Sequence, residues 1–312
     1  MDLARMFKLF LLFTTILTIE TTVLCCLFST KYPLRFSSTE LSKQEEASPE
    51  SPEPKAEVGQ KEISEKLEAI MGEDAERFSI YLLRPGKETE PLLYQSRPMS
   101  PASMIKLFVL AEAMQEVRDG RASLDDMVAL RERDMVDGSG ILTGYEEGTK
   151  IPLRKLMELM ITESDNTATN ILIDRAGMKR INRYLKERGY GDTLLQHKMM
   201  LSNRGKRNLS SARDVGVLLT RIYRRECVGD PYDELMINFL MRQTDSECFP
   251  KALPSWHIAH KTGEVSGLYD DGGIFYGEKG DFILVIMSDS YSGRDNAIQT
   301  MQEIARYVAG TL

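Results

Sequence analysis

The residues best placed to do chemistry in this 312-residue chain are a serine and a lysine in the segment Ser-Pro-Ala-Ser-Met-Ile-Lys at positions 100–106. Ser100 is a good N-cap and Pro101 suits the first helical position, so we expect Ser103 in the first turn of a helix. Backbone N–H groups there have no partner within the helix, and the positive end of the helix dipole lies at the same place. Ser103 could therefore be a nucleophile whose own N–H helps to stabilise an oxyanion.

Lys106 follows Ser103 by three residues, so on a helix its amine lies on the same face. A lysine can take a proton from a serine hydroxyl only if its pKa falls, and burial or a nearby positive charge lowers it. Taken alone, this serine and lysine are a weak signal, because most such pairs at helix starts are structural.

A second motif, Ser164-Asp165-Asn166, lies between two predicted helices. Such residues often serve only as caps and turns at a helix boundary. As functional groups, Ser164 could shuttle a proton and the Asn166 amide could hold a substrate, while Asp165 would brace the loop.

A third motif, Lys261-Thr262-Gly263, lies on a predicted strand. Lys261 could attract a substrate carboxylate, and Thr262 could hydrogen-bond it. Gly263 would let a substrate lie against the strand, where a side chain would obstruct it. The backbone N–H of Glu264 is a candidate second oxyanion donor.

The three motifs together are much stronger evidence of function than any one of them, because they occur in this order in the chain. About 60 residues separate the first from the second, and about 100 separate the second from the third. From about Ile63 onward the chain resembles the class A β-lactamases and penicillin-binding proteins. The resemblance implies that Ser103 attacks a β-lactam or D-alanyl amide carbonyl and forms an acyl-enzyme. It also implies that Lys106 accepts the proton, which Ser164 and Lys261 relay to the leaving nitrogen.

One part of the class A pattern is missing. Those enzymes carry a glutamate in a loop between the second and third motifs, with an asparagine four residues later, and this glutamate activates the deacylating water. The corresponding stretch, about 191–211, offers Lys198 and Ser202 at these positions and Asp192 as its only acid. We therefore expect slow deacylation. The alternatives are a D-alanyl-D-alanine carboxypeptidase or related peptidoglycan hydrolase, and a β-lactam sensor that is acylated without turnover.

Hydrophobic periodicity predicts the elements that position these residues. Helices are expected at 63–71, 101–117, 153–161, 167–175, 181–186, 212–224 and 295–308, and strands at 78–83, 92–95, 256–265, 273–276 and 282–288. Strands near both chain ends with helices between them predict an α/β (α+β) fold. We expect a mainly antiparallel sheet, flanked by N- and C-terminal helices, with an inserted all-helical region, as the β-lactamase/transpeptidase resemblance implies.

The first 60 residues are expected to lie outside this fold. Residues 1–29 hold basic residues followed by apolar runs, which suit an uncleaved membrane anchor, a cleaved signal peptide or, through Cys25 and Cys26, a lipoprotein. Residues 30–60 are predicted to be a disordered acidic linker, and residues 61–312 the hydrolase domain. All three readings place the domain outside the cytoplasmic membrane, in the bacterial cell envelope.

Composition and charge limit the kinds of partner and cofactor that we expect this chain to bind. The net charge of −7 argues against nucleic acid, and the three histidines lack a metal-binding spacing, so we expect no cofactor and no metal. The expected partners are a small-molecule β-lactam or D-Ala-D-Ala peptide and, through the N-terminal segment, a membrane, with the chain as a monomer. Cys227 and Cys248 could form a disulfide or remain buried free thiols.

Overall fold

The structure is a computed structural model that describes residues 59–88, 90–201, 205–289 and 293–311. The expected anchor or signal segment (1–29) and nearly all of the expected linker (30–60) lie outside these residues. In the part that is described, no helix is both long enough and apolar enough to cross a membrane. The first described helix, α2 (Gln60–Met71), begins at the expected boundary between linker and domain.

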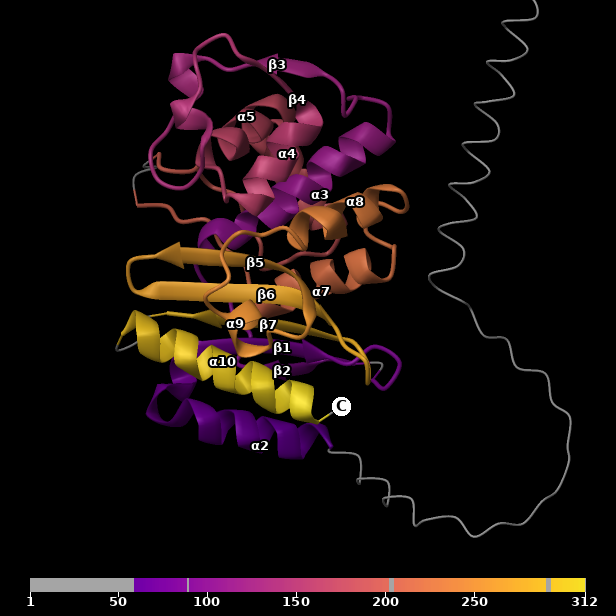
Figure 1. Ribbon diagram of the computed structural model, residues 1–312, viewed down its shortest axis with the longest axis vertical. Coiled ribbons are helices and arrows are strands. Elements are labelled where there is room, and N and C mark those ends of the chain that lie inside the picture. Colours follow the sequence, from indigo (N-terminus) through magenta and orange to yellow (C-terminus); the bar gives the residue numbers. More distant parts are fainter. Residues whose placement is uncertain (1–58, 89, 202–204, 290–292, 312) are drawn as a thin grey trace, which may run out of the picture. The chain divides into compact units, whose positions relative to one another are not determined.

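A five-stranded antiparallel sheet forms the middle of the fold, in the order β2-β1-β7-β6-β5 (Figure 1). The strands are β1 (Phe78–Leu83), β2 (Leu92–Tyr94), β5 (His257–Val265), β6 (Leu268–Tyr276) and β7 (Phe282–Ser288). Segments from both ends of the chain meet where Phe78 pairs with Ser288. The predicted α/β fold with a mainly antiparallel sheet is confirmed.

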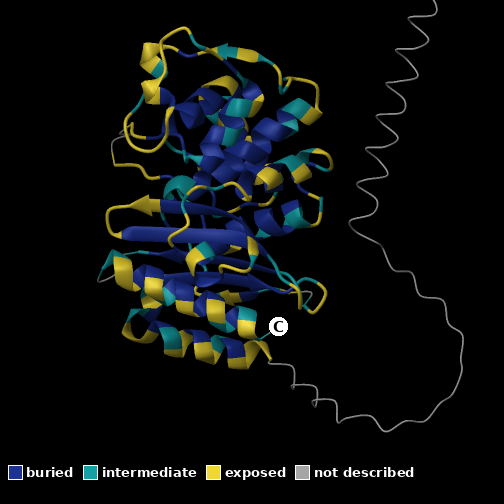
Figure 2. Cartoon of the chain, in the orientation of Figure 1, coloured by how far each residue is buried: buried dark blue, intermediate teal, exposed yellow. Residues whose placement is uncertain are grey.

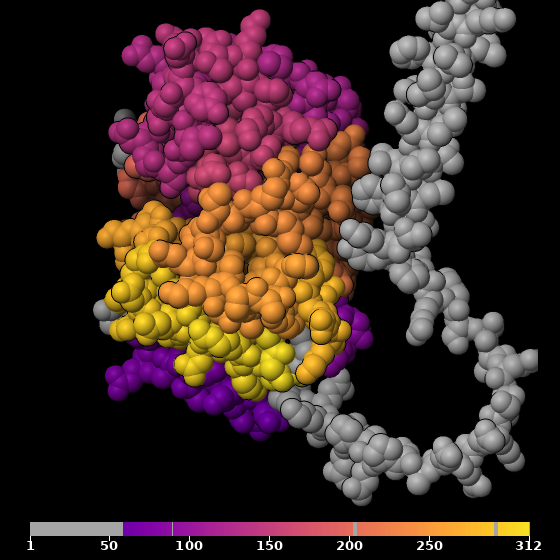
Figure 3. Space-filling model, viewed as in Figure 1, coloured from indigo at the N-terminus to yellow at the C-terminus, as the bar shows by residue number. Residues whose placement is uncertain are grey.

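Helices cover both faces of this sheet. On one face α2 packs beside α10 (Arg294–Gly310), so the first and last described helices lie together (Figure 3). Phe282, Leu284 and Ile286 of β7 belong to the core beneath these two helices, whereas Ile283 and Val285 belong to the core on the helical side. Because both faces are covered, the whole of β7 is buried and its sequence is continuously apolar (Figure 2).

The other face carries the inserted helical region. Its elements are α3 (Ile105–Arg118), α4 (Leu153–Thr162), α5 (Asn166–Ala176), α6 (Met178–Glu187), α7 (Ala212–Tyr223), α8 (Tyr232–Leu240) and a two-stranded ribbon of β3 (Met127–Ala129) and β4 (Lys150–Pro152). The short α9 (Phe249–Ala252) packs instead against α10, on the opposite face of the sheet. Helix α3 is central, because 11 of its 14 residues are buried. The sequence reading missed α8 and the ribbon.

Both body cysteines are buried free thiols. Cys227 belongs to the core on the helical side of the sheet, and Cys248 to the core beneath α2 and α10. Because the two thiols lie in different cores, the structure supports free thiols over a disulfide.

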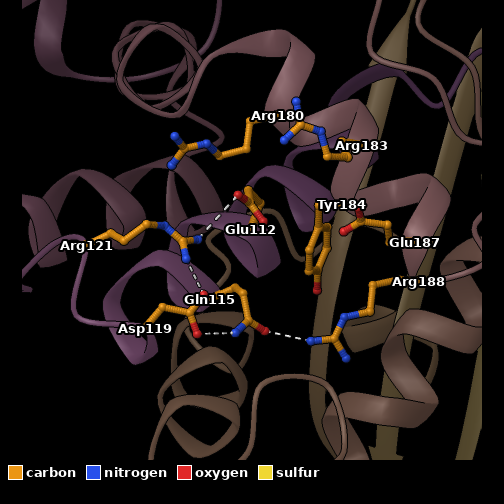
Figure 4. Close-up of a pocket in the computed structure, with 9 residues that line it drawn as sticks. All are labelled: Glu112, Gln115, Asp119, Arg121, Arg180, Arg183, Tyr184, Glu187 and Arg188. Carbon is orange, nitrogen blue, oxygen red and sulfur yellow. Dashed lines mark hydrogen bonds and ion pairs between the residues drawn. The ribbon is translucent and has the colours of Figure 1, made fainter.

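The C-terminal half of α3 packs against α6, and charged side chains face one another where the two helices meet (Figure 4). Arg180 donates to Glu116 at 2.5 Å, and the Arg121 guanidinium lies 3.9 Å from the Glu112 carboxylate. Glu112, Arg121 and Arg180 line a hollow of about 470 Å³, together with further acidic and arginine side chains. Because Arg180 of α6 pairs with Glu116 of α3 beside it, we assign the hollow a structural role in joining the two helices.

Glu112 should make the stability of this junction depend on pH. Burial, reinforced by the Glu116 carboxylate, raises the pKa of Glu112 to about 7. An unfolded glutamate titrates near pH ~4.3, so between these values only the folded state holds the proton. The free energy of unfolding therefore falls as pH rises through this window. We predict that Glu112→Gln raises the free energy of unfolding by roughly 3 kcal/mol at pH ~8, and by less toward pH ~5.

Urea unfolding at both pH values checks this prediction. Glu187→Gln, which alters an exposed carboxylate of the same hollow, is the control and should change the free energy of unfolding by less than about 0.5 kcal/mol. A gain for Glu112→Gln that is the same at both pH values would contradict the raised pKa.

Candidate active site

Ser103 lies in a 3-10 turn, η2 (Ala102–Met104), directly before α3. The predicted continuous helix from residue 101 is therefore wrong at its start, and Ser100 does not cap it. The Met104 N–H instead closes the turn by donating to the Pro101 carbonyl at 2.8 Å. Ala102 has a φ of 41°, a conformation that is costly for a residue with a Cβ. Ser103 thus sits in a strained bend at the head of a buried helix.

The close approach of strand β5 shapes this turn. A Cβ built on Gly263 would lie 2.7 Å from the Pro101 carbonyl oxygen and 3.2 Å from the Met104 nitrogen. Gly263 therefore makes room for the turn that carries Ser103, a packing role that the sequence pattern did not predict. Beside it, the Thr262 hydroxyl accepts a hydrogen bond from Gln243 at 3.1 Å.

Lys106 is fully buried beneath this turn. Its amine donates to the Ser164 carbonyl at 2.5 Å, to the Ser164 hydroxyl at 3.0 Å and to the Asn166 Oδ1 at 2.8 Å. Burial, reinforced by the positive charge of Lys261, lowers the pKa of Lys106 well below its ordinary value. The first and second motifs are therefore in direct contact, and Lys106 gives up its proton more readily there than an exposed lysine does.

Lys261 reaches the same serine from the sheet. Its amine donates to the Ser164 hydroxyl at 3.1 Å and to the Thr262 carbonyl at 2.8 Å. Burial lowers the pKa of Lys261 to about 8, although the carboxylates of Asp245 and Asp271 oppose this shift. One hydroxyl therefore lies between two buried amines whose proton affinities are both reduced.

The backbone around Ser164 is held by Asp165. This buried side chain caps α5 by accepting from the Ala168 N–H at 2.8 Å. Its other oxygen accepts from the N–H groups of Ile141 and Leu142 at 2.7 and 2.9 Å. Ser164 has a φ of 52°, so the loop fixes it in a left-handed conformation. Asp165 thus positions the hydroxyl without touching it.

The motifs meet at a cleft of about 820 Å³. Ser103, Asn166 and Glu264 line the cleft, together with the loop 197–200 and the turn between β5 and β6. Lys106 and Lys261 lie fully buried beneath these lining residues, where Ser164 joins them. Within the described part of the chain, no cluster of three histidine, cysteine or acidic side chains is placed to hold a metal ion.

The loop expected to carry a catalytic glutamate presents Met199 to the cleft. Asn170, buried on α5, fixes this residue by accepting from the Met199 N–H at 2.7 Å and donating to its carbonyl at 3.1 Å. The Lys198 amine instead pairs with both oxygens of Asp174, at 2.9 and 3.0 Å. The Lys198 side chain is thus held by Asp174 and is not among the residues that line the cleft, and Ser202 lies outside the described residues.

One feature of the sequence could have indicated that the loop around Met199 is held against α5. Asn170 is a polar residue on a helix face that is otherwise buried, and a buried amide requires hydrogen-bond partners. The partner it finds lies 29 residues away, which no local pattern reveals.

Sequence comparison places the chain among known proteins. A profile of the beta-lactamase enzyme family matches residues 62–312. The chain is 27% identical over 202 residues to the beta-lactamase BRO-1 of Moraxella catarrhalis, covering 62% of this chain and 64% of that protein. It is 30% identical over 193 residues to a beta-lactamase of Streptomyces fradiae, covering 55% and 60%. The chain thus spans a little under two thirds of the length of these relatives.

Solved structures show the same architecture. A beta-lactamase of Sphaerobacter thermophilus superposes with a TM-score of 0.75 at 22% identity, covering 81% of this chain and 98% of that one. PBP-A gives a TM-score of 0.73 at 23% identity, covering 80% and 94%. These structures share the fold, and the profile spans nearly all of the described residues. The chain therefore belongs to the beta-lactamase enzyme family.

Proposed function

We propose that this protein is a class A β-lactamase-like serine hydrolase that opens β-lactam amides through an acyl-enzyme on Ser103 and deacylates slowly. The observation that carries the proposal is the Ser164 hydroxyl, 3.0 Å from the Lys106 amine and 3.1 Å from the Lys261 amine, beside the cleft that Ser103 lines. A structure of a PBP-A variant bound to penicillin G as an acyl-enzyme, with a TM-score of 0.74, supports a β-lactam as the ligand.

Acylation follows from the lowered pKa of Lys106. A neutral amine takes the Ser103 proton while the Ser103 Oγ bonds to the β-lactam carbonyl carbon. The N–H groups of Ser103 and of Glu264, on the edge strand β5, are the proposed oxyanion donors. When the C–N bond breaks, the proton passes from Lys106 through the Ser164 hydroxyl to the leaving nitrogen.

Substrate binding is proposed to use the remaining motif residues. Lys261, whose pKa is lowered to about 8, keeps much of its positive charge at neutral pH and attracts the substrate carboxylate. Thr262 would hydrogen-bond that carboxylate, and Gly263 keeps β5 against the serine turn. The Asn166 amide, which already donates to the Asp137 carbonyl at 3.2 Å, would hold the substrate from the opposite side.

A D-alanyl-D-alanine carboxypeptidase is the second candidate. It is favoured by Met199, because the described part of the 191–211 loop presents this apolar side chain to the cleft instead of a carboxylate. Mass spectrometry with penicillin and with a D-Ala-D-Ala peptide separates the candidates. Release of D-alanine at many turnovers per chain would favour the peptidase, whereas a sensor would stay acylated by penicillin without turnover.

We predict that Ser103→Ala abolishes covalent labelling by a fluorescent penicillin, because no other hydroxyl lies in the strained turn before α3. In-gel fluorescence measures the labelling, and a thermal melt checks the fold. Ser100→Ala, which alters a serine on the same cleft, should still be labelled. Labelling of the Ser103→Ala protein at the wild-type rate would show that another residue is the nucleophile.

We predict that Met199→Glu speeds deacylation by about 10²-fold or more, because a carboxylate would then face the acyl carbon and activate water. Lys198→Glu is the matched control, since it adds the same group one residue earlier, on the side chain that points to Asp174. Steady-state hydrolysis of a chromogenic cephalosporin measures both variants. Equal gains for the two, or none for Met199→Glu, would contradict the assignment of Met199 as the residue facing the cleft.

A further inference from the structure

The cleft contains a histidine that the proposed acylation does not use. His197 is half-buried and lines the same cleft as Ser103 and Asn166. It lies two residues before Met199, on the loop that the Asn170 side chain fixes to α5. A neutral imidazole has one ring nitrogen whose lone pair can accept a proton.

The backbone of His197 is held firmly. Asn208, which is 5% exposed, accepts from the His197 N–H at 3.1 Å and donates to the His197 carbonyl at 3.1 Å. The same Oδ1 also accepts from the Gln196 N–H at 2.7 Å. These bonds use the His197 peptide groups and not its ring, so exchanging the ring leaves them in place.

The imidazole is held as one tautomer. Its Nδ1 lies 2.7 Å from the Lys198 carbonyl oxygen, and since a carbonyl only accepts, Nδ1 carries the hydrogen. In the neutral ring, Nε2 is then the acceptor. Among the described residues none hydrogen-bonds to this Nε2, and His197 lines the cleft.

The other ionisable groups on the cleft wall are engaged or unsuited. The Glu264 carboxylate accepts from Arg294 at 2.7 and 3.1 Å, and Asp289 lies 3.8 Å from Arg97. Arg207 cannot act as a base, because a guanidinium keeps its proton in proteins. Lys106 and Lys261 both hydrogen-bond to the Ser164 hydroxyl, and both are already used in the proposed acylation step. His197 is thus the uncommitted base among the described residues that line the cleft.

We propose that His197 is the general base of deacylation and acts through one water molecule. The inference rests on the proposed Ser103 acyl-enzyme. The His197 Nε2 takes a proton from water as the water oxygen bonds to the acyl carbon. The tetrahedral intermediate then collapses, and the bond from carbon to the Ser103 Oγ breaks. That oxygen regains a proton, relayed from His197 by water in the cleft, and the product leaves as a carboxylic acid.

The test uses the full chain loaded with benzylpenicillin, with excess antibiotic removed and the acyl-enzyme followed by intact-mass spectrometry. His197→Ala and His197→Gln should still gain one penicilloyl group per chain, and that group should be lost at least about tenfold more slowly than in wild type. Added imidazole should restore the loss in His197→Ala, where it can occupy the vacated space, more than in His197→Gln. His257→Ala, which removes an exposed histidine of β5, is the control and should match wild type.

Two results would overturn the assignment of His197 while leaving the proposed function intact. One is loss of the penicilloyl group at the wild-type rate in both His197 variants. The other is slow loss in both variants that imidazole does not accelerate beyond its effect on wild type, since this would indicate a structural role for the ring. Failure of the wild-type chain to become acylated would overturn both the inference and the proposed function.

Discussion

The arrangement of the site depends on two buried lysine amines that converge on one hydroxyl. Lys106 comes from α3, Lys261 from β5 and Ser164 from the junction of α4 and α5, so the fold must bring three distant segments together. Burying two ammonium groups side by side would be very costly, and the cost falls when they give up protons. The same burial that closes the core around α3 therefore also produces an amine able to act as a base.

Strain and close contact are concentrated around the proposed nucleophile. Ala102 and Ser164 both have positive φ values, and each lies within one residue of a group that the proposed reaction uses. Such conformations persist when the surrounding structure determines them. Here Gly263 packs against the turn, and Asp165 accepts hydrogen bonds from the backbone of the loop at 141–142. The sheet edge and the helical region thus hold the turn from opposite sides.

Much of the fold was predictable, because amphipathic periodicity is a local property. The three motifs could also be found and ordered from the sequence. The 3-10 turn at Ser103 could not be distinguished from a helical start, since the contact with Gly263 that shapes it comes from a strand about 160 residues later. Which residues of the 191–211 loop line the cleft could not be predicted, because the amide of Asn170 fixes Met199 there across 29 residues of the chain.

The proposed acylation groups lie beneath a loop that presents an apolar side chain to the cleft, and we therefore propose that acylation outpaces deacylation. Stopped-flow hydrolysis of a chromogenic cephalosporin tests this claim most directly. The account predicts a burst of product equal to the enzyme concentration, followed by a slow linear phase. A linear trace without a burst, at hundreds of turnovers per second, would contradict it and show that deacylation is as fast as acylation.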